Sequence, residues 1–277
     1  MGWPDQDEGS RGVKDRPPYR SYSQLTEWMK CGESFRLTRR VGVKEKPSVW
    51  LPGGTAFHNT TERYDLDSLH GMSITSVWHE ELQAAIEEQI NNAPVEFQDP
   101  STWRVAGRGK ETLDWWREKG PEWCEAYVRW REASDLQLVE NGVEAELMPQ
   151  LSGVLVKMYP DRVFVDKHGQ ALIVDLKTGS SEQPSSLQLG VYRVGVAKLT
   201  GLDAEWGAFY SARKGALEPP VRLDQWTEER IGALFATFDE QERAGQYLPN
   251  IGSHCKYMCS VKQWCVYQGG TPHPEDE

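Results

Sequence analysis

Residues 159–179, YPDRVFVDKHGQALIVDLKTG, decide how the rest of this chain is interpreted. Two runs rich in β-branched and aliphatic residues, 162–165 and 171–176, flank the short polar stretch 167–169, which contains a glycine. This pattern predicts a β-hairpin with a tight turn. The hairpin is the reference point for the other motifs, because charged residues stand directly before its first strand and at the end of its second.

The second predicted strand ends in Asp175, Leu176 and Lys177. Side chains alternate between the two faces of a strand, so Asp175 and Lys177 leave on one face and Leu176 on the other. An exposed ion pair would contribute only about 0 to 1 kcal/mol. A metal site that needs an oxygen ligand and a nearby cation would use both charged side chains.

These motifs resemble the signature of the PD-(D/E)XK nuclease superfamily. Pro160-Asp161 precedes the first strand, and Asp175-Leu176-Lys177 ends the second. The continuation Lys177-Thr178-Gly179, with a helix predicted after it, resembles the RecB-like branch. The resemblance implies a mixed α/β fold with a restriction-endonuclease-like core, and a metal-dependent DNA exonuclease that hydrolyses phosphodiester bonds.

The order of predicted elements agrees with an α/β fold. Residues 70–135 carry apolar residues at helical spacing, which we interpret as a helical insertion that covers the core. Two strands are predicted within 136–158, a further strand over 204–211, and a helix over 225–241. Helices alternating with strands in this way predict a mixed central sheet flanked by helices.

Composition limits the other possibilities. The chain has 277 residues, a net charge of −11 and a hydrophobic content of 38%. No apolar run approaches the roughly 18 residues of a membrane helix, and the polar start shows no secretory signal, so we expect a cytoplasmic location. We predict a single nuclease domain over 18–268, with disorder over 1–17 and 269–277.

A second motif contains Gly53, Gly54, Thr55, His58 and Glu62. We predict a glycine loop and a helix capped by Thr55, with His58 and Glu62 on one helical face because they are four residues apart. A histidine–glutamate surface pair would give the same pattern. RecB-like nucleases have a similar helix, so the resemblance implies that His58 is a metal ligand and Glu62 a supporting residue.

The resemblance also implies the metal and its other ligands. It assigns Mg²⁺ or Mn²⁺ to His58, Asp161 and Asp175, with the backbone carbonyl of Leu176 as a further ligand. Oxygen-rich sites suit these ions. His58, Asp161 and Asp175 are then the catalytic ligands, and Lys177 is the catalytic lysine.

The helix predicted from residue 185 to about 199 carries Gln188 and Tyr192, four residues apart. An ordinary polar helix face would show the same spacing. The pair also resembles the glutamine-x-x-x-tyrosine motif of the RecB-like branch, which implies that both side chains bind DNA.

Five cysteines supply a further signal. Cys255, Cys259 and Cys265 lie within eleven residues, and Cys31 stands near the end of the first predicted helix. Such clustering in a cytosolic protein indicates metal ligation. The resemblance to iron–sulfur members, the AddB-type nuclease domain and the CRISPR-associated four-cysteine exonucleases, implies a [4Fe–4S] cluster that clamps the two chain ends. Zinc or disulfides would use the same thiols, and Cys124 is predicted to be a core residue.

The gaps between the clustered cysteines are three and five residues, where iron–sulfur members usually have two and five. Two basic tracks are candidates for DNA backbone contact, or else scattered solvated charge. They are Arg36, Arg39, Arg40, Lys44 and Lys46 in one, and Arg104, Arg108 and Lys110 in the other.

The expected partner is DNA, single-stranded or with free ends, in recombination, repair or CRISPR-type adaptation. A helicase or recombination protein could assist, since the chain has no nucleotide-binding motif of its own. The alternative functions are a non-catalytic iron–sulfur DNA-binding module, a structure-specific DNA endonuclease and an electron carrier.

Overall fold

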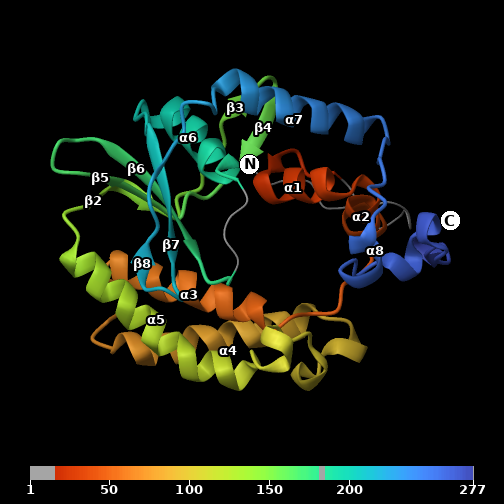
Figure 1. The fold of residues 1–277 in the computed structure, drawn as a ribbon, viewed down its shortest axis with the longest axis horizontal. Helices are drawn as coiled ribbons and strands as arrows, with labels where there is room; N and C mark the ends of the chain where they lie inside the picture. Colours follow the sequence, from red (N-terminus) through yellow and green to blue (C-terminus); the bar gives the residue numbers. More distant parts are fainter. Residues whose placement is uncertain (1–15, 181–184, 277) are drawn as a thin grey trace, which may run out of the picture. The chain divides into compact units, whose positions relative to one another are not determined.

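The computed structural model describes residues 16–180 and 185–276 (Figure 1). Most of the N-terminal segment that is predicted to be disordered lies outside these ranges. The chain divides into two compact units. We call Tyr19–Tyr22 with Lys46–Thr237 the sheet unit, and Ser23–Glu45 with the described residues from Phe238 onward the cysteine unit.

The main sheet of the sheet unit has the strand order β2-β5-β6-β7-β8, and β9 also pairs with β7. Strands β5 and β6 are antiparallel and form the predicted hairpin, while β6 and β7 are parallel. The mixed α/β prediction is therefore confirmed. The bounds are β2 (Gln137–Val143), β5 (Arg162–Val165), β6 (Ala171–Lys177), β7 (Trp206–Ser211), β8 (Ala216–Leu217) and β9 (Val221–Arg222).

A smaller sheet holds β1 (Arg20–Ser21), β4 (Val154–Lys157) and β3 (Gln150–Leu151), in that order. It pairs β1 with β4 in parallel and β4 with β3 in a tight hairpin. Together with β2, the region 136–158 thus holds three strands where two are predicted. The short β3 strand is hard to recognise in a sequence because only two residues pair.

Helices α3, α4 and α5 pack against one another and against the main sheet, along the lower part of the view in Figure 1. They are α3 (Trp50–Asp65), α4 (Ile74–Asn92) and α5 (Leu113–Ala133), and between the last two lie the 3₁₀ turns η2 (Val95–Phe97), η3 (Pro100–Thr102) and η4 (Gly107–Gly109). Their shared core contains Trp78, Trp116 and Tyr127 together with Leu176 of β6. Burying such side chains stabilises the fold by about 1.5–3 kcal/mol each.

The predicted glycine loop before His58 is wrong. Helix α3 already begins at Trp50, so Gly53, Gly54 and Thr55 lie inside it. A Cβ atom on Gly53 would lie 2.2 Å from the Trp116 ring, so this glycine permits close helix packing. The consequence is a rigid position for His58, about 12 Å along the helix axis from its first residue.

Helix α6 (Leu187–Thr200) connects the parallel strands β6 and β7. Helix α7 (Glu228–Arg243) begins in the sheet unit and ends in the cysteine unit. None of the helices in the described ranges is both long and apolar enough to cross a membrane.

The cysteine unit consists of short helices and loops. It contains α1 (Tyr22–Lys30) apart from Tyr22, α2 (Gly32–Arg36), the π-helical turn η1 (Leu37–Val41), α8 (Ser253–Tyr257), and the 3₁₀ turns η5 (Lys262–Trp264), η6 (Val266–Gln268) and η7 (Pro274–Asp276). The buried pair Arg40–Glu242 joins its two chain segments, and Asp276 of the tail forms an ion pair with Arg36.

Candidate active site

Strand β6 ends in a buried carboxylate beside an ammonium group. The Asp175 side chain is 1% exposed, and Lys177 Nζ lies 2.6 Å from its Oδ2 atom. Apart from this contact with Lys177, neither carboxylate oxygen has a hydrogen-bond partner among the described residues. The ammonium offsets part of the free-energy cost of burying the carboxylate, and the remaining lone pairs are available to a further cation.

The strand register brings Asp161 to the same place. Arg162 of β5 pairs with Val174 of β6, so Asp161, one residue earlier, comes level with Asp175. Asp161 is buried, and its Oδ2 atom accepts a hydrogen bond from the backbone N–H of Leu176 at 2.6 Å. The hairpin alone therefore sets the separation of the two carboxylates.

Helix α3 adds His58. Its Nδ1 atom lies 3.6 Å from Asp161 Oδ2, and its Nε2 atom lies 3.2 Å from the carbonyl oxygen of Leu176. The four groups predicted as metal ligands are thus brought to one end of the hairpin, although they come from residues up to 118 positions apart in the chain (176 − 58).

Glu144 belongs to the same site and is not predicted from the sequence. Its Oε1 atom lies 3.2 Å from His58 Nδ1. Across residues 16–180 and 185–276, His58, Glu144 and Asp161 form the one group of at least three such side chains whose ligand atoms all lie within 4.8 Å of one another. Glu146 pairs instead with Lys157 at 2.7 Å.

Glu62 is predicted to support His58, and it lies one turn further along α3. In the described part of the chain, the carboxylates within hydrogen-bond or ion-pair reach of His58 are those of Glu144 and Asp161. Burial raises the pKa of Glu62, and the negative charge of Glu144 adds to this rise. The charge of Glu144 therefore acts on Glu62 as well as on His58.

Burial and like charge make this pocket unfavourable for carboxylate anions. Burial raises the pKa of Asp161, His58 opposes the rise, and Asp175 and Glu144 reinforce it, to about 7. Burial also raises the pKa of Asp175, against the attraction of Lys177. Burial lowers the pKa of His58, but Asp161 and Glu144 outweigh it and raise the value to about 9. Several acidic groups that share one buried space attract a cation.

Lys177 is held from two sides. Its Nζ atom donates to Gln188 Oε1 at 2.9 Å, and Gln188 Nε2 donates to the Tyr192 hydroxyl at 3.0 Å. Burial lowers the pKa of Lys177, but the nearby Asp175 carboxylate outweighs it and raises the value, so the amine stays protonated. Tyr22 also feels the charges of this site. Burial raises the pKa of its hydroxyl, the Lys177 ammonium lowers it and the Asp175 carboxylate raises it. This tyrosine is not predicted from the sequence as a site residue.

A buried arginine, Arg162, supports the site by holding the backbone of Asp161. The Arg162 side chain is 0% exposed, and its guanidinium pairs with Asp65 at 2.5 Å and donates to the Asp161 carbonyl at 2.6 Å. Asp65 in turn accepts from Tyr127 and Arg131 of α5. Removing one partner of such a pair costs about 3–5 kcal/mol. Through Asp65, helix α5 is thereby connected to Arg162, the residue next to Asp161.

These groups fit a divalent metal ion. Asp161, Asp175, Glu144, His58 and the Leu176 carbonyl offer mostly oxygen ligands, which Mg²⁺ and Mn²⁺ prefer. Beyond the Lys177 ammonium, the oxygens of Asp175 lack hydrogen-bond partners in the described residues, which leaves lone pairs for a metal ion. Such an ion would also neutralise the clustered carboxylates.

The cysteine unit brings the two chain ends together. Asn250 donates its backbone N–H to Cys31 Sγ at 3.4 Å and accepts from Cys255 Sγ at 3.6 Å through its carbonyl. Cys259 and Cys265 lie in the same unit, and all are free thiols. Cys124 is instead fully buried between the helices of the sheet unit, as predicted for a core residue, and burial raises its pKa far above the usual range.

The four predicted cluster cysteines do not form a tight group in the described chain, in contrast to the His58 group. Zinc–sulfur bonds of about 2.3 Å in a tetrahedron place the sulfurs about 3.8 Å apart. A [4Fe–4S] cube stands between its ligands and holds them farther apart.

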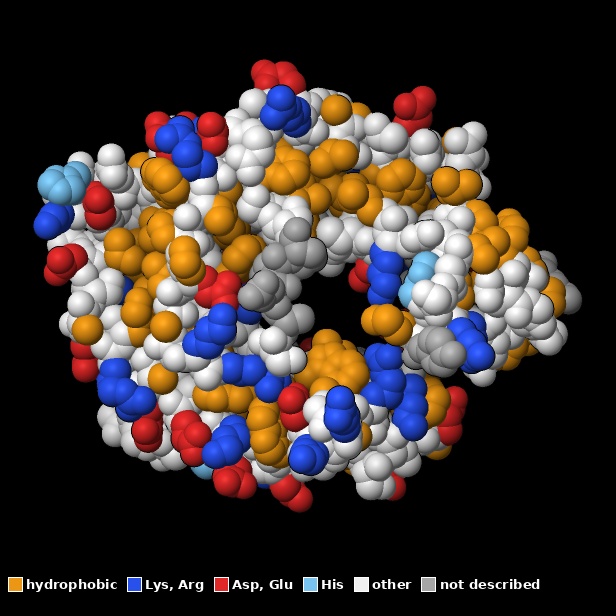
Figure 2. All heavy atoms as spheres, viewed as in Figure 1, with side chains coloured by type: hydrophobic (Ala, Val, Ile, Leu, Met, Phe, Trp, Pro, Cys, Tyr) orange, Lys and Arg blue, Asp and Glu red, His pale blue; other side chains and the backbone are white. Residues whose placement is uncertain are grey.

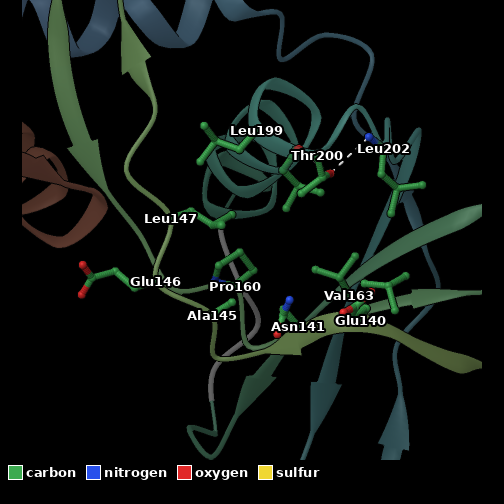
Figure 3. Close-up of a pocket in the computed structure, with 12 residues that line it drawn as sticks. Glu140, Asn141, Ala145, Glu146, Leu147, Pro160, Val163, Leu199, Thr200 and Leu202 are labelled. Carbon is green, nitrogen blue, oxygen red and sulfur yellow. Dashed lines mark hydrogen bonds between the residues drawn. The ribbon is translucent and has the colours of Figure 1, made fainter.

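A cavity of about 570 Å³ lies beside the main sheet (Figure 3). Leu147, Pro160 and Leu199 face it, and the Thr200 hydroxyl at its edge accepts a hydrogen bond from the Leu202 N–H. None of the residues predicted for the site lines it. The cavity lacks the convergent charged groups found at the end of β6.

Comparisons with known proteins agree with this geometry. The family model of the PD-(D/E)XK nuclease superfamily matches residues 20–266. The chain is 31% identical over 269 residues to the Gene 69 protein of Mycobacterium phage D29, covering 90% of this chain and 96% of that protein. It is 26% identical to the Gene 69 protein of Mycobacterium phage L5, with the same two coverages.

Among solved structures, the chain is similar to the one titled "Crystal structure of SSO0001". The identity is 13%, the TM-score is 0.34, and the match covers 89% of this chain and 95% of that one.

Proposed function

The chain belongs to the PD-(D/E)XK nuclease superfamily, whose members are metal-dependent nucleases, and from this premise we propose that it is a RecB-like DNA exonuclease. The observation that carries the proposal is the Asp175 carboxylate, which is buried and has the Lys177 ammonium as its one polar partner among the described residues. His58, Asp161 and Glu144 form a tight group of candidate ligands in the same site. Several acidic groups around a single ammonium favour the binding of a further cation.

We assign the metal site to His58, Asp161, Asp175 and the Leu176 carbonyl, with Glu144 as an added ligand or as the partner that orients His58. A bound divalent ion would lower the pKa of a water molecule and stabilise the charge on a phosphate. Holding the ligands in a strand hairpin and a helix keeps them in place before substrate arrives.

Lys177 would neutralise the negative charge that develops on the phosphate. The ion pair with Asp175 and the hydrogen bond that Lys177 donates to Gln188 hold its Nζ atom in place, and its raised pKa keeps it charged. A protonated amine cannot accept a proton from water, so a role in charge stabilisation is favoured over one as general base.

Gln188 and Tyr192 would then act in two ways. Tyr192 is buried, so its hydroxyl supports Gln188, and Gln188 supports Lys177. DNA contact by this pair is a further proposal, which requires Gln188 to exchange its bond with Lys177 for one with a phosphate.

The cysteine unit would hold a [4Fe–4S] cluster on Cys31, Cys255, Cys259 and Cys265. The bridging by Asn250 supports a site between the two chain ends. In this proposal the cluster is a structural clamp, because metal binding contributes directly to folding. DNA that is single-stranded or has free ends remains the proposed substrate, and a helicase or recombination protein is the proposed partner, in the cytoplasm.

The test uses end-labelled linear DNA, both single- and double-stranded, and covalently closed circles, each with Mn²⁺. We expect the wild-type protein to shorten linear DNA from its ends and to leave closed circles intact. Cutting of circles would favour the alternative of a structure-specific endonuclease. No cleavage by a protein that still binds DNA would favour the non-catalytic module.

A further inference from the structure

The loop between α4 and α5 carries a group of positive charges that the active site does not use. Residues 104–110, RVAGRGK, contain Arg104, Arg108 and Lys110 and no acidic residue. In the described ranges no carboxylate lies within ion-pair distance of these three cations, and the Nε atom of Arg104 is buried without a hydrogen-bond partner. Arg108 and Lys110 are exposed.

The other candidate basic track differs in this respect. Arg36 pairs with Glu33 and Asp276, Arg39 with Glu27, and Arg40 with Glu242. These three arginines are already paired within the cysteine unit, whereas the exposed Lys44 and Lys46 of the same track have no carboxylate within ion-pair distance among the described residues. Figure 2 likewise shows Lys and Arg side chains interspersed with Asp and Glu on the face in view, without a continuous basic band.

The loop is held at both of its ends, by the start of α3 and by the residue that follows Lys177. At the first end, the backbone of Arg104 bonds to that of Pro47 and Val49, and its guanidinium lies over the Trp50 ring, 5.3 Å from the centroid. Trp50 begins α3, the helix that carries His58. In Figure 1 the loop belongs to the yellow segment beside the orange start of α3.

At the second end, Glu111 anchors the loop to the residue after Lys177. The Glu111 carboxylate accepts two bonds from Arg213, at 3.0 and 2.7 Å, and Arg213 Nε donates to the Thr178 carbonyl at 2.7 Å. The Arg213 guanidinium also lies 5.2 and 5.4 Å from the ring centroids of Trp115 and Trp123. Paired in this way, Arg213 serves as an anchor, and Arg108 and Lys110 of the loop keep their charges free among the described residues.

We propose that loop 104–110 binds the phosphate backbone of the DNA strand that enters the active site, with Arg108 and Lys110 as the contacting side chains. This inference rests on the proposed function, because it names the surface that holds the same substrate. An overall charge of −11 repels DNA, so a local group of unpaired cations is needed to hold a polyanion near the site. Contacts to phosphates carry no sequence information.

The backbone of this loop offers a variant that separates binding from folding. Arg108 has a φ of 57° and lies between Gly107 and Gly109, which also have positive φ. This conformation suits glycine better than arginine. Arg108→Gly therefore removes a charge without disturbing the fold, and its melting temperature should equal or exceed that of the wild type.

The experiment measures binding of a fluorescein-labelled single-stranded oligonucleotide by anisotropy in EDTA, over a series of salt concentrations. The double variant Arg108→Gly, Lys110→Ala should bind about tenfold more weakly at low salt, and its log–log salt slope should be shallower by about 1.4, or about 0.7 for each lost contact to a single strand. Lys167→Ala is the matched control. It removes one exposed charge from the hairpin turn, at the opposite end of β6, about 20 Å away.

An unchanged affinity and slope in a folded double variant would overturn the inference, and so would an equal loss in Lys167→Ala. Cleavage of the same oligonucleotide by the wild-type protein with Mn²⁺ is measured separately. Its absence would contradict the proposed function, whereas normal cleavage with unchanged binding by the loop variant would contradict this inference alone.

Discussion

The sheet unit and the cysteine unit prepare their candidate sites in different ways. In the sheet unit, strand register and a helix bring His58, Asp161 and Glu144 within 4.8 Å of one another without any ion. In the cysteine unit, Asn250 links two of the four thiols, but the described residues form no comparable group. Regular elements can hold ligands against their mutual repulsion, whereas short helices and loops need the bound group to complete the arrangement.

The largest effect on cleavage is expected for Asp175→Ala, which removes the buried ligand from the sheet unit. Cleavage with Mn²⁺ should fall by at least about 10³-fold, the upper end of what a single electrostatic group contributes. The same variant should lose the rise in melting temperature that Mn²⁺ gives the wild type. Glu146→Gln is the control, since this acid pairs with Lys157 away from the site. Equal activity of wild type and Asp175→Ala would disprove the assignment.

Lys177→Ala tests the role of the positive charge that the Asp175 carboxylate holds in place. The variant should still bind Mn²⁺ and DNA but cut about 100-fold more slowly, because a group that stabilises developing charge contributes a few kcal/mol. Single-turnover rates with saturating enzyme separate this chemical step from binding. Near-normal turnover would show that Lys177 has a structural role at the end of β6.

The hairpin and its charged residues could be predicted because they are local. Asp175 and Lys177 share a face through strand alternation alone, and Asp161 comes level with Asp175 through a turn of few residues. Glu144 could not be chosen over Glu146 from the sequence. Glu144 has a left-handed φ of 45° directly after β2, and that backbone turn aims its carboxylate at a histidine 86 residues away.

The glycines before His58 show where prediction from local sequence fails. Gly53 and Gly54 have the sequence appearance of a loop, yet the packing of Gly53 against Trp116 keeps them inside α3. Tertiary contacts of this kind override local preference. The basic loop 104–110 is a similar case, since its cations could be identified from the sequence but its anchors, Trp50 and Arg213, could not.

Glu144→Gln tests how much Glu144, which is not predicted from the sequence, contributes to the site of the sheet unit. The amide keeps the size of the side chain but removes the negative charge beside His58. Cleavage should fall about 10-fold, in the range found for partners that orient metal ligands, and a higher Mn²⁺ concentration should be needed for half-maximal activity. Glu62→Gln is the comparison, because Glu62 stands one step further from His58. A larger loss in Glu62→Gln would reverse the two assignments.

Cys255→Ala tests whether the cysteine unit depends on its bound group. The wild-type protein, purified without oxygen, should be brown and contain iron, and the variant should lose both colour and iron. Its melting temperature should fall because the clamp between the chain ends is lost. Cleavage should fall only a few-fold, since the ligands of the nuclease site belong to the sheet unit. Colourless wild-type protein with one zinc per chain would refute the iron assignment and leave the proposed nuclease function unaffected.

Cys124→Ala should have the smallest effect, and it decides which unit holds the cluster. Cys124 is packed between the helices of the sheet unit, and burial makes its thiol hard to ionise, whereas a metal ligand must be a thiolate. The variant should keep its iron, its colour and its cleavage rate, and lose about 1 kcal/mol of stability for one small buried group. Cys31→Ala is the paired measurement and should lose iron as Cys255→Ala does. If Cys124→Ala lost the iron while Cys31→Ala kept it, the cluster would not belong to the cysteine unit, and the contrast between a preformed site and one completed by its bound group would fail.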